Sequence, residues 1–509
     1  MARDYAAAVQ ALNTLQSNFQ IVDAIRKSGR GMNQNAIPEM IEWTKRIGYE
    51  PSDLDTLKAI HVAGTKGKGS TSAFVSSILY QYRNTGYGSP SKIGLYTSPH
   101  LRFIRERIQI DNQPLSEAMF AKYFFETWDR LEASAKAAGH PDPSSPETKP
   151  VYFRFLTLMA FHCYISEGVD AAIIECGIGG EYDSTNILVK PAVTAVTSLG
   201  IDHTAMLGDT IDSIAWHKSG IFKASVPAFS APQAENAVEV LQKRAAERNT
   251  SLHVVPHHTA LDSLTLGLAA DFQRINASVA IAAASSYLRS QGHTDVPDPT
   301  DHSTPLPTRF KTGLEQVHFG GRCETRNDLS HRLTWYIDGG HTLESIEMAA
   351  RWFSTQISSS ASSPTSSNPA PRILIFNQQS RDARSLALKL YGTLASALGA
   401  EKPFTHALFC TNTTYKDSGF KPDLTSINTN SRDVELLSVQ NKLAETWIEV
   451  DAECGVEVWK TVEEAVARAR EIANLQGEGV KVLVTGSLHL VGGVIEVLES
   501  ELEIQGSAK

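Results

Sequence analysis

A glycine-rich segment at residues 61–70 contains the residue types that bind phosphate groups. Its three glycines let backbone N–H groups converge on one anion, and Lys68 adds a positive charge for the phosphoryl oxygens. The residues that we expect to bind the nucleotide phosphates are Gly64, Thr65, Lys66, Gly67, Lys68, Gly69 and Ser70.

The spacing of this segment differs from the usual Walker A motif. That motif would need glycine at position 62 and serine or threonine at position 69, where the chain has Val62 and Gly69. Gly69 has no hydroxyl to offer to Mg²⁺, so either Ser70 or a hydroxyl from elsewhere in the chain must take that role. An apolar run before the segment predicts a strand, and residues 71–79 predict a helix whose N-terminus adds its positive dipole end.

Apolar, strand-like runs alternate with helical stretches, as in parallel sheets covered by helices. We expect strands at residues 57–62, 92–96, 169–174, 192–198 and 226–229, and a second series at 333–337, 372–376, 406–409, 456–459 and 480–484. This predicts an α/β protein. Residues 1–310 would form an ATP-binding domain with a parallel-rich sheet and covering helices, and residues 313–509 a smaller Rossmann-like domain. The linker, at about 295–312, contains four prolines within 296–307, which exclude a helix or a sheet interior.

Polar or glycine-rich clusters follow four strands of the first series, at residues 64–70, 97–101, 175–180 and 200–204. Ligands of open α/β sheets bind beyond the carboxyl ends of the strands. Glu175 and His203 would therefore project toward the phosphate segment, where they could hold divalent cations beside ATP. Lys218 lies on an expected helix, where a lone lysine is usually a solvated charge.

Composition excludes several classes of protein. A net charge of −9 over 509 residues gives no reason to expect a nucleic-acid partner, and no uncharged apolar run is long enough to span a membrane. The N-terminus has neither a signal core nor the look of a transit peptide, so we expect a cytoplasmic protein. Five scattered cysteines without a CxxC pair argue against a disulfide framework or a zinc site. Residues 141–150 and 358–371 are expected to be surface insertions.

Several motifs occur in the order in which one family carries them. They are YFRFLT at residues 152–157, ECGIGG at 175–180, DSTN at 183–186, LGIDH at 199–203, LGDT at 207–210, IDGGHT at 337–342 and VTGSLHLVGG at 484–493. Together they closely resemble the folylpolyglutamate synthases of the eukaryotic type, which are related to the Mur ligases. The resemblance covers nearly the whole chain, and the first domain is accordingly expected to be similar to the central domain of Mur ligases.

The resemblance implies an ATP-dependent ligase. ATP would phosphorylate the γ-carboxylate of the terminal glutamate of folate, tetrahydrofolate or a folylpolyglutamate. The amino group of L-glutamate would then attack the acyl phosphate, with release of ADP and phosphate. Two Mg²⁺ ions are implied, with K⁺ as an optional further cation. We expect a monomer, and a mitochondrial form stays an alternative.

The resemblance also assigns the catalytic residues. Lys68 would hold the β- and γ-phosphates. Ser98 and Glu175 would bind the first Mg²⁺. Ser98 would thereby supply the hydroxyl that Gly69 lacks. His203 and Glu175 would hold the second Mg²⁺, helped by Lys218 in the form of a carbamate. A neutral amine is needed to react with CO₂, so partial burial of Lys218 would be required to lower its pKa.

The nucleotide site in relatives includes a His-Gln pair followed by Asn-Ala. Here Phe272 replaces the histidine, while Gln273 and Asn276 remain as expected contacts of ATP. Arg322 resembles an arginine that reaches the γ-phosphate, and Asp338 would lie at the ribose side. The residues implied for folate are Thr97, His100, Phe153 and Asp183, and those implied for glutamate are His341 and Ser487.

Two alternatives stay open. Dihydrofolate synthase, which joins glutamate to dihydropteroate, is a variant within the family. A P-loop regulatory protein would bind and hydrolyse ATP without ligation, but it would leave Asp338, His341 and the segment 485–493 unexplained.

Overall fold

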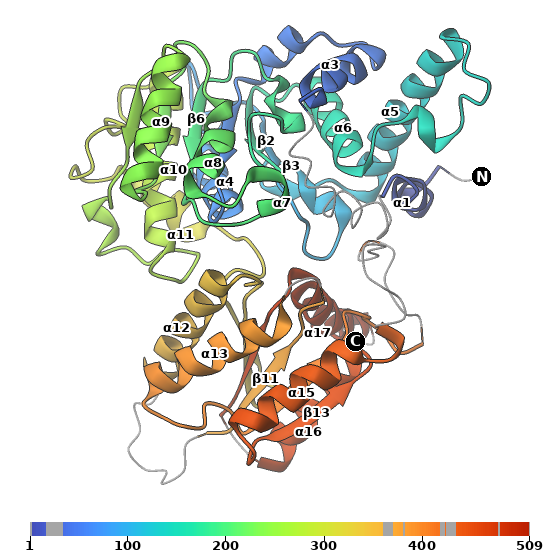
Figure 1. Cartoon of the computed structure of the whole chain (residues 1–509). Coiled ribbons are helices and arrows are strands. Elements are labelled where there is room, and N and C mark those ends of the chain that lie inside the picture. Colours follow the sequence, from blue (N-terminus) through green and yellow to red (C-terminus); the bar gives the residue numbers. More distant parts are fainter. Residues whose placement is uncertain are drawn as a thin grey trace. The chain divides into compact units, whose positions relative to one another are not determined.

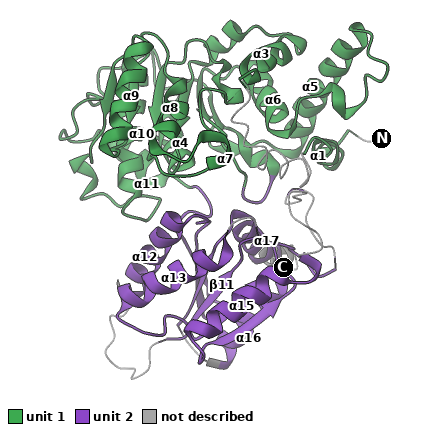
Figure 2. Ribbon diagram, in the orientation of Figure 1, with its two compact units in different colours: residues 1–100, 104–318 green, residues 101–103, 319–509 purple. Residues whose placement is uncertain are grey.

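The computed structural model describes residues 3–16, 34–359, 370–379, 382–417, 423, 434–476 and 479–507. The chain divides into two compact units (Figures 1 and 2). Unit 1 consists of residues 1–100 and 104–318, and unit 2 of residues 101–103 and 319–509. Three residues from the first part of the chain, Leu101–Phe103, thus belong to unit 2. The domain limits expected at residues 310 and 313 stay a prediction.

Unit 1 contains an eight-stranded sheet in the order β4-β3-β2-β5-β1-β6-β7-β8. Its strands are β1 (Ile60–Ala63), β2 (Ile93–Tyr96), β3 (Ile108–Ile110), β4 (Gln113–Pro114), β5 (Ala171–Glu175), β6 (Val193–Val196), β7 (Ala228–Ser230) and β8 (Leu252–Val254). Six neighbouring strands of the sheet are parallel, namely β2, β5, β1, β6, β7 and β8. β3 and β4 add an antiparallel edge. The central strands β1, β2, β5 and β6 are buried along their whole length, as expected of a parallel sheet covered on both faces.

Helices pack on this sheet in groups. They are α1 (Tyr5–Asn13), α3 (Ala36–Arg46), α4 (Lys68–Tyr80), α5 (Glu117–Ala137), α6 (Tyr152–Glu167), α7 (Thr204–Leu207), α8 (Ile211–Lys218), α9 (Glu235–Glu247), α10 (Gln273–Ser290) and α11 (Thr308–Gln316). α4 packs against α10, α11, β2 and β5. α1, α3, α5 and α6 share one apolar core, while α8 and α9 share another with β1, β6 and β7. The phosphate segment leads directly into α4, at the centre of the unit.

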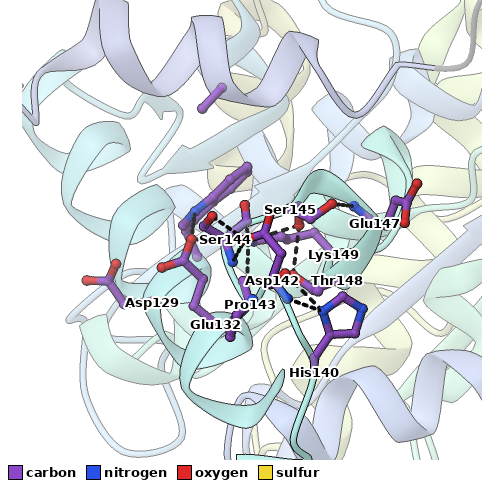
Figure 3. A network of polar contacts seen from close by, with 12 residues as sticks. Asp129, Glu132, His140, Asp142, Pro143, Ser144, Ser145, Glu147, Thr148 and Lys149 are labelled. Carbon is purple, nitrogen blue, oxygen red and sulfur yellow. Dashed lines mark hydrogen bonds and ion pairs between the residues drawn. The ribbon is translucent and has the colours of Figure 1, made fainter. Parts of the chain in front are cut away.

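The segment expected as a surface insertion at residues 141–150 is organised around a buried lysine (Figure 3). Lys149 has no exposed side-chain surface. Its Nζ donates to Glu132 Oε1 at 3.1 Å and to the backbone oxygens of residues 143, 144 and 145 at 3.0, 2.9 and 3.2 Å. The ammonium also lies 4.5 Å from the ring centroid of Trp128. Lys149 therefore ties the segment to α5, directly before α6 begins.

Unit 2 contains a six-stranded sheet in the order β13-β12-β11-β14-β10-β9. Its strands are β9 (Glu324–Asp328), β10 (Leu333–Ile337), β11 (Arg372–Phe376), β12 (His406–Cys410), β13 (Gly455–Trp459) and β14 (Val480–Thr485). All are parallel except β9, which pairs antiparallel with β10. The expected α/β class is confirmed, because both sheets are mostly parallel and covered by helices.

Side chains that alternate along β10 face two different helix layers, as the period of a strand requires. Trp335 and Ile337 join the core formed with α16 (Val462–Gln476) and α17 (Leu488–Ser507). Tyr336 instead packs its ring against Trp352 and Phe353 of α12 (Leu343–Ser359). α12 packs against α13 (Ala383–Leu398), which packs against α15 (Ser438–Val450).

All ten strands expected from the sequence occur, with ends displaced by up to three residues. Residues 57–59 precede β1, and Leu57 ends a 3₁₀ helix at Pro51–Leu57. The strands that were not expected, β3, β4, β8 and β9, are two to five residues long and lie at or next to sheet edges. Most of the expected insertion at residues 358–371 lies outside the described residues. In the described part of the chain, no helix is long and apolar enough to span a membrane.

Candidate active site

The phosphate segment, residues 64–70, is held in shape by the residues that directly follow β6. The backbone N–H groups of Thr65 and Lys66 both donate to Ser198 O at 3.0 Å. Gly64 has φ +149°, and a Cβ there would lie 1.9 Å from Thr197 Oγ1. Only glycine fits this approach. The N–H groups at the start of α4 have no partner within the helix, as at any helix N-terminus, so they can bind an anion.

A second helix, α10, supports the segment from the other side. Gly67 adopts φ +87°, and a Cβ there would lie 2.1 Å from Asn276 Oδ1. Asn276 Nδ2 donates to Gln273 Oε1 at 2.8 Å, and Gln273 Nε2 donates to Ser70 Oγ at 3.2 Å. Gln273 and Asn276, expected as nucleotide contacts, are thus buried supports of the phosphate segment in this structure. Their contact with ATP stays a prediction.

Glu175 lies at the end of β5, beside the phosphate segment. It is 3% exposed. Its Oε2 accepts a hydrogen bond from the backbone N–H of Ser98 at 3.1 Å, and its Oε1 lies 4.0 Å from Lys68 Nζ. The structure therefore brings together the carboxylate, the lysine and the serine that the sequence predicted. Carboxylate and hydroxyl oxygens at the edge of a phosphate site are ligands that Mg²⁺ prefers.

Lys218, at the end of α8, reaches the same place from another direction. Its side chain is buried, and Nζ donates to Gly64 O at 2.8 Å. Lys68 Nζ donates to that same carbonyl oxygen at 3.0 Å. Burial, together with the nearby charge of Lys68, lowers the pKa of Lys218 to about 7. Lys218 is therefore not a solvated surface charge, and much of it is a neutral amine at physiological pH.

His203 lies on the loop after β6, and its side chain is exposed. It has φ +52° and precedes the short helix α7. Its backbone N–H donates to Asp202 Oδ1 at 2.9 Å, and Asp202 Oδ2 lies 3.3 Å from Lys66 Nζ. Asp202, which was not expected at the site, thus joins the His203 loop to the phosphate segment. Among the described residues, no group of three or more His, Cys, Asp and Glu side chains could hold a metal ion by itself.

The four residues expected to bind folate lie on neighbouring elements of unit 1. Thr97 is buried directly after β2, and His100 Nδ1 accepts a hydrogen bond from Arg107 Nε at 2.9 Å. Phe153, on α6, packs against Gly177, because a Cβ at that glycine would lie 2.6 Å from the ring.

Asp183, the fourth residue, already has partners. Its Oδ1 accepts from the N–H and hydroxyl of Thr185 at 3.0 and 2.6 Å, and its Oδ2 accepts from Ile178 N at 3.0 Å. Burial raises its pKa. A folate donor would have to share these two oxygens.

The candidate residues of unit 2 gather at the carboxyl ends of β10 and β14. Asp338 is buried, which raises its pKa, and its two oxygens accept from Cys323 N and Gly340 N, each at 2.9 Å. His341 Nδ1 lies 3.1 Å from Gly339 O. The neighbouring loops meet through Gly486, whose N–H donates to Gly340 O at 3.0 Å.

Ser487 precedes α17, and its Oγ accepts from His489 N at 3.2 Å. Arg322 also belongs to unit 2, where its Nη1 donates to Gly321 O at 3.2 Å. The contacts with ATP and glutamate that the resemblance gives to these side chains stay predictions.

The sequence did not predict a cluster of amide side chains in unit 2, which begins directly after β11. Gln378 Nε2 donates to Gly486 O at 2.8 Å. Asn377, which is fully buried, donates to Asn412 Oδ1 at 2.9 Å and accepts from Gln440 Nε2 at 2.7 Å. The signal in the sequence was the change from an apolar strand to Asn-Gln-Gln at residues 377–379, the pattern that identified the clusters in unit 1.

Comparison with known proteins extends over nearly the whole chain. The chain is 44% identical over 501 residues to a folylpolyglutamate synthase of Neurospora crassa, covering 98% of this chain and 92% of that protein. It is 43% identical to the folylpolyglutamate synthase of Saccharomyces cerevisiae strain S288c, covering 98% and 88%. The chain belongs to the folylpolyglutamate synthase family.

Solved structures of synthases from this family share the fold. An apo form of the L. casei enzyme superimposes with a TM-score of 0.65 at 22% identity, covering 95% of this chain and 100% of that one. The Mycobacterium tuberculosis enzyme complexed with ADP gives 0.66 at 19% identity, covering 97% and 99%. No general family model matches the chain. The resemblance inferred from the motifs is confirmed.

Within unit 1, the structure brings Lys68, Glu175, Lys218 and the Ser98 backbone together around the phosphate segment of this synthase. Their predicted metal and phosphate contacts stay predictions. Phe272, which replaces the histidine of the family motif, is half-buried at the start of α10 and precedes Gln273.

Proposed function

We propose that the chain is an ATP-dependent ligase that adds L-glutamate to the γ-carboxylate of tetrahydrofolate and of folylpolyglutamates. The observation that carries this proposal is the identity of 44% to a folylpolyglutamate synthase over 98% of the chain. The phosphate segment, with two lysines on one carbonyl oxygen, supports it at the level of chemistry. The reaction needs ATP because a free carboxylate is a poor acyl donor, whereas an acyl phosphate has a good leaving group.

In this proposal, the phosphate segment binds ATP through the N-terminus of α4. Lys68 turns from Gly64 O to the β- and γ-phosphates when ATP is bound, and its positive charge offsets the charge that develops during phosphoryl transfer. The buried supports Gln273 and Asn276 keep the loop in its binding shape before the nucleotide arrives. Such preorganisation lowers the cost of forming the transition state.

Glu175 and the hydroxyl of Ser98 are proposed to hold a first Mg²⁺, and His203 with Glu175 a second. Glu175 supports this reading because it is a buried carboxylate beside the phosphate segment, with Oε1 4.0 Å from Lys68 Nζ. A site with one or two protein carboxylates agrees with Mg²⁺, which keeps several waters and phosphate oxygens as ligands. Bound Mg²⁺ would neutralise phosphate charge and polarise the carbonyl oxygen under attack.

Lys218 is proposed to carry a carbamate. Its pKa of about 7, caused mainly by burial, leaves a neutral amine able to react with CO₂. The carbamate would retain one N–H for Gly64 O and add a carboxylate beside the phosphate segment. K⁺ as a further cation, a monomeric state and a cytoplasmic location remain expectations from the sequence.

The folate is proposed to lie over Thr97, His100, Phe153 and Asp183, with the aromatic ring of Phe153 offering a face to the substrate. Glutamate is proposed to bind in unit 2, at His341 and Ser487. The support within unit 2 is that its loops meet at the carboxyl ends of parallel strands, where open α/β sheets bind their ligands.

One assay tests the reaction. The purified chain is incubated with ATP, Mg²⁺, tetrahydrofolate and labelled glutamate, and both ADP and labelled folate are measured. We expect ADP release that requires both folate and glutamate, with one glutamate incorporated for each ADP. Folate-independent ADP release without incorporation would instead identify a simple ATPase. Preference for dihydropteroate over tetrahydrofolate would identify a dihydrofolate synthase.

A further inference from the structure

Arg107 is a buried cation next to the candidate folate residues. It ends a short 3₁₀ helix at Ile104–Arg107, directly before β3. The antiparallel pairing of β2 and β3 places Tyr96 opposite Ile108, and Arg107 O accepts the backbone N–H of Thr97 at 3.0 Å. Arg107 therefore lies beside the residue that begins the polar loop after β2. The whole residue is only 9% exposed.

His100 and Tyr152 contact the guanidinium, and neither is a carboxylate. Nε donates to His100 Nδ1 at 2.9 Å, so the ring proton of a neutral His100 lies on Nε2. The guanidinium carbon lies 5.5 Å from the ring centroid of Tyr152. Across the described residues, no carboxylate forms an ion pair with Arg107, and both of its Nη nitrogens lack a protein hydrogen-bond acceptor.

The other buried cations among the described residues either form an ion pair with a carboxylate or have a lowered pKa. Arg244, 6% exposed, pairs with Glu181 and Glu247, and Lys149 pairs with Glu132. Lys218 has no carboxylate partner within the described part of the chain, but its pKa falls to about 7 and the charge is partly lost. Arginine cannot lose its proton under these conditions. Arg107, which is 9% exposed, has no carboxylate partner in the residues that the structure describes, and an unpaired charge at such a position is costly.

We propose that Arg107 binds the α-carboxylate of the terminal glutamate of the folate substrate. The two free Nη groups match a carboxylate in the bidentate manner that guanidinium favours. The inference rests on the proposed function, because the residues around Arg107 are the candidate folate residues Thr97 and His100 and the neighbour of Phe153.

The chemistry of the substrate explains why this carboxylate is the one to recognise. The γ-carboxylate must remain free for phosphorylation, and γ-linked elongation leaves the α-carboxylate of every residue unmodified. The terminal residue therefore presents the same charge, the same few bonds from the reacting carbon, after each cycle. A single arginine at this place can position short and long substrates alike.

The test compares tetrahydrofolate with its α-carboxamide, which retains the γ-carboxylate, in binding titrations on four proteins. Wild type should prefer tetrahydrofolate by about 10- to 100-fold, the range expected for a charge-assisted pair. Arg107→Gln should bind both ligands equally weakly, and Arg107→Lys should keep part of the preference. Arg46→Gln, an exposed arginine on α3, is the matched control and should behave as wild type.

The outcomes separate the inference from the function on which it rests. Equal binding of the two ligands by wild type, or an undiminished preference in Arg107→Gln, would overturn the inference. The wild-type comparison needs no variant, so it decides even if the substitution prevents folding. If Arg107→Gln raises the KM for glutamate and leaves the KM for folate unchanged, Arg107 binds the incoming glutamate instead. That result would also overturn the inference. Failure of the proposed function would instead appear as wild type that releases no folate-dependent ADP.

Discussion

Lys218 shows how one buried side chain can acquire reactivity from its surroundings. Its ammonium form is disfavoured by burial and by Lys68, which shares the carbonyl oxygen of Gly64. The same lysine on the surface would be almost fully protonated at neutral pH. The position thus supplies the neutral amine that carbamate formation requires.

We predict that ¹³C-labelled bicarbonate gives a carbamate NMR signal from the folded protein that depends on pH around 7. A lowered lysine pKa means that the neutral form predominates above about 7 and is lost below it. The signal should therefore be strong at pH 8 and weak at pH 6. Lys218→Ala should lose both the signal and turnover while retaining ATP binding. Lys243→Ala, on the exposed side of α9, serves as control, and a signal that survives in Lys218→Ala would refute the assignment.

The turn between β1 and α4 depends on glycine for reasons of space as well as backbone angle. Gly67 has a left-handed φ of +87°, and it also lies against the amide of Asn276. Gly139, after α5, has a similar φ of +76° with open space around it. The two positions therefore separate the cost of the angle from the cost of the contact.

Gly139→Ala should lose about 1–2 kcal/mol of stability, the cost of a left-handed backbone for alanine, and Gly67→Ala should lose more, because its methyl group also meets Asn276. Only Gly67→Ala should lose ATP binding, because its methyl group must displace Asn276 and, with it, the start of α10. Thermal unfolding and nucleotide titration measure the two effects. Equal ATP affinity in both variants would show that the contact with Asn276 does not shape the site.

The connection between α5 and α6 depends on the buried ammonium of Lys149. Replacing Lys149 with methionine removes four hydrogen bonds and the positive charge beside Glu132. Pro143 O and Ser145 O keep the hydroxyl of Thr148, and Glu132 keeps Trp128 Nε1, whereas Ser144 O loses the donor that Lys149 supplies. We expect a loss of about 2 kcal/mol and a fall in Tm of about 4–8 °C, with an unchanged KM for ATP. Lys136→Met, on the exposed end of α5, should leave Tm within about 2 °C of wild type. A Tm for Lys149→Met no lower than that of the control would contradict the interpretation.

Elements with a strong periodic signal were predictable from the sequence, and those set by tertiary contacts were not. The buried strand β10 was predicted to the residue because five apolar-rich positions stand between polar turns. β9 reads ETRND and carries no apolar signal, since it forms an edge whose pairing with β10 decides its conformation.

The same division holds for the site. Glu175 could be placed because it ends a buried strand, whereas the depth of Lys218 could not, since it depends on packing among α8, the phosphate segment and β6. Arg107 lay in an unremarkable Arg-Glu-Arg run. Its lack of a carboxylate partner is visible only when the neighbouring elements are in place.

The division of the whole molecule does not follow the order of the chain. Leu101–Phe103 leave unit 1 after His100 and return at Ile104, so the chain passes between the units three times. Within unit 2, Arg102 donates to Glu496 Oε2 at 2.7 and 2.9 Å and also pairs with Glu499. Glu496 is 4% exposed. The stability of unit 2 therefore depends on a residue encoded more than 200 positions before the rest of it.

Arg102→Met should destabilise unit 2 by about 3–5 kcal/mol, because it leaves a buried carboxylate without its arginine. Adding Glu496→Gln should recover part of the loss, since an amide carries no charge. Hydrogen exchange of unit 2 amides in the full chain measures both variants. Arg384→Met breaks an exposed pair with Glu449 and should cost no more than about 1 kcal/mol. Similar exchange in the Arg102 and Arg384 variants would argue against the interpretation.

The placement of Leu101–Phe103 also limits which parts of related enzymes can be exchanged. A chimera joined at the proline-rich linker would receive the second unit of one parent and the three-residue segment of the other. Arg102 would then face a foreign residue at position 496, and Leu101 foreign neighbours at Gly320 and Gly321. Recombination that respects function must therefore transfer residues 101–103 together with the C-terminal part. The part of the chain that must be exchanged as a whole is therefore encoded by two separate stretches of the gene.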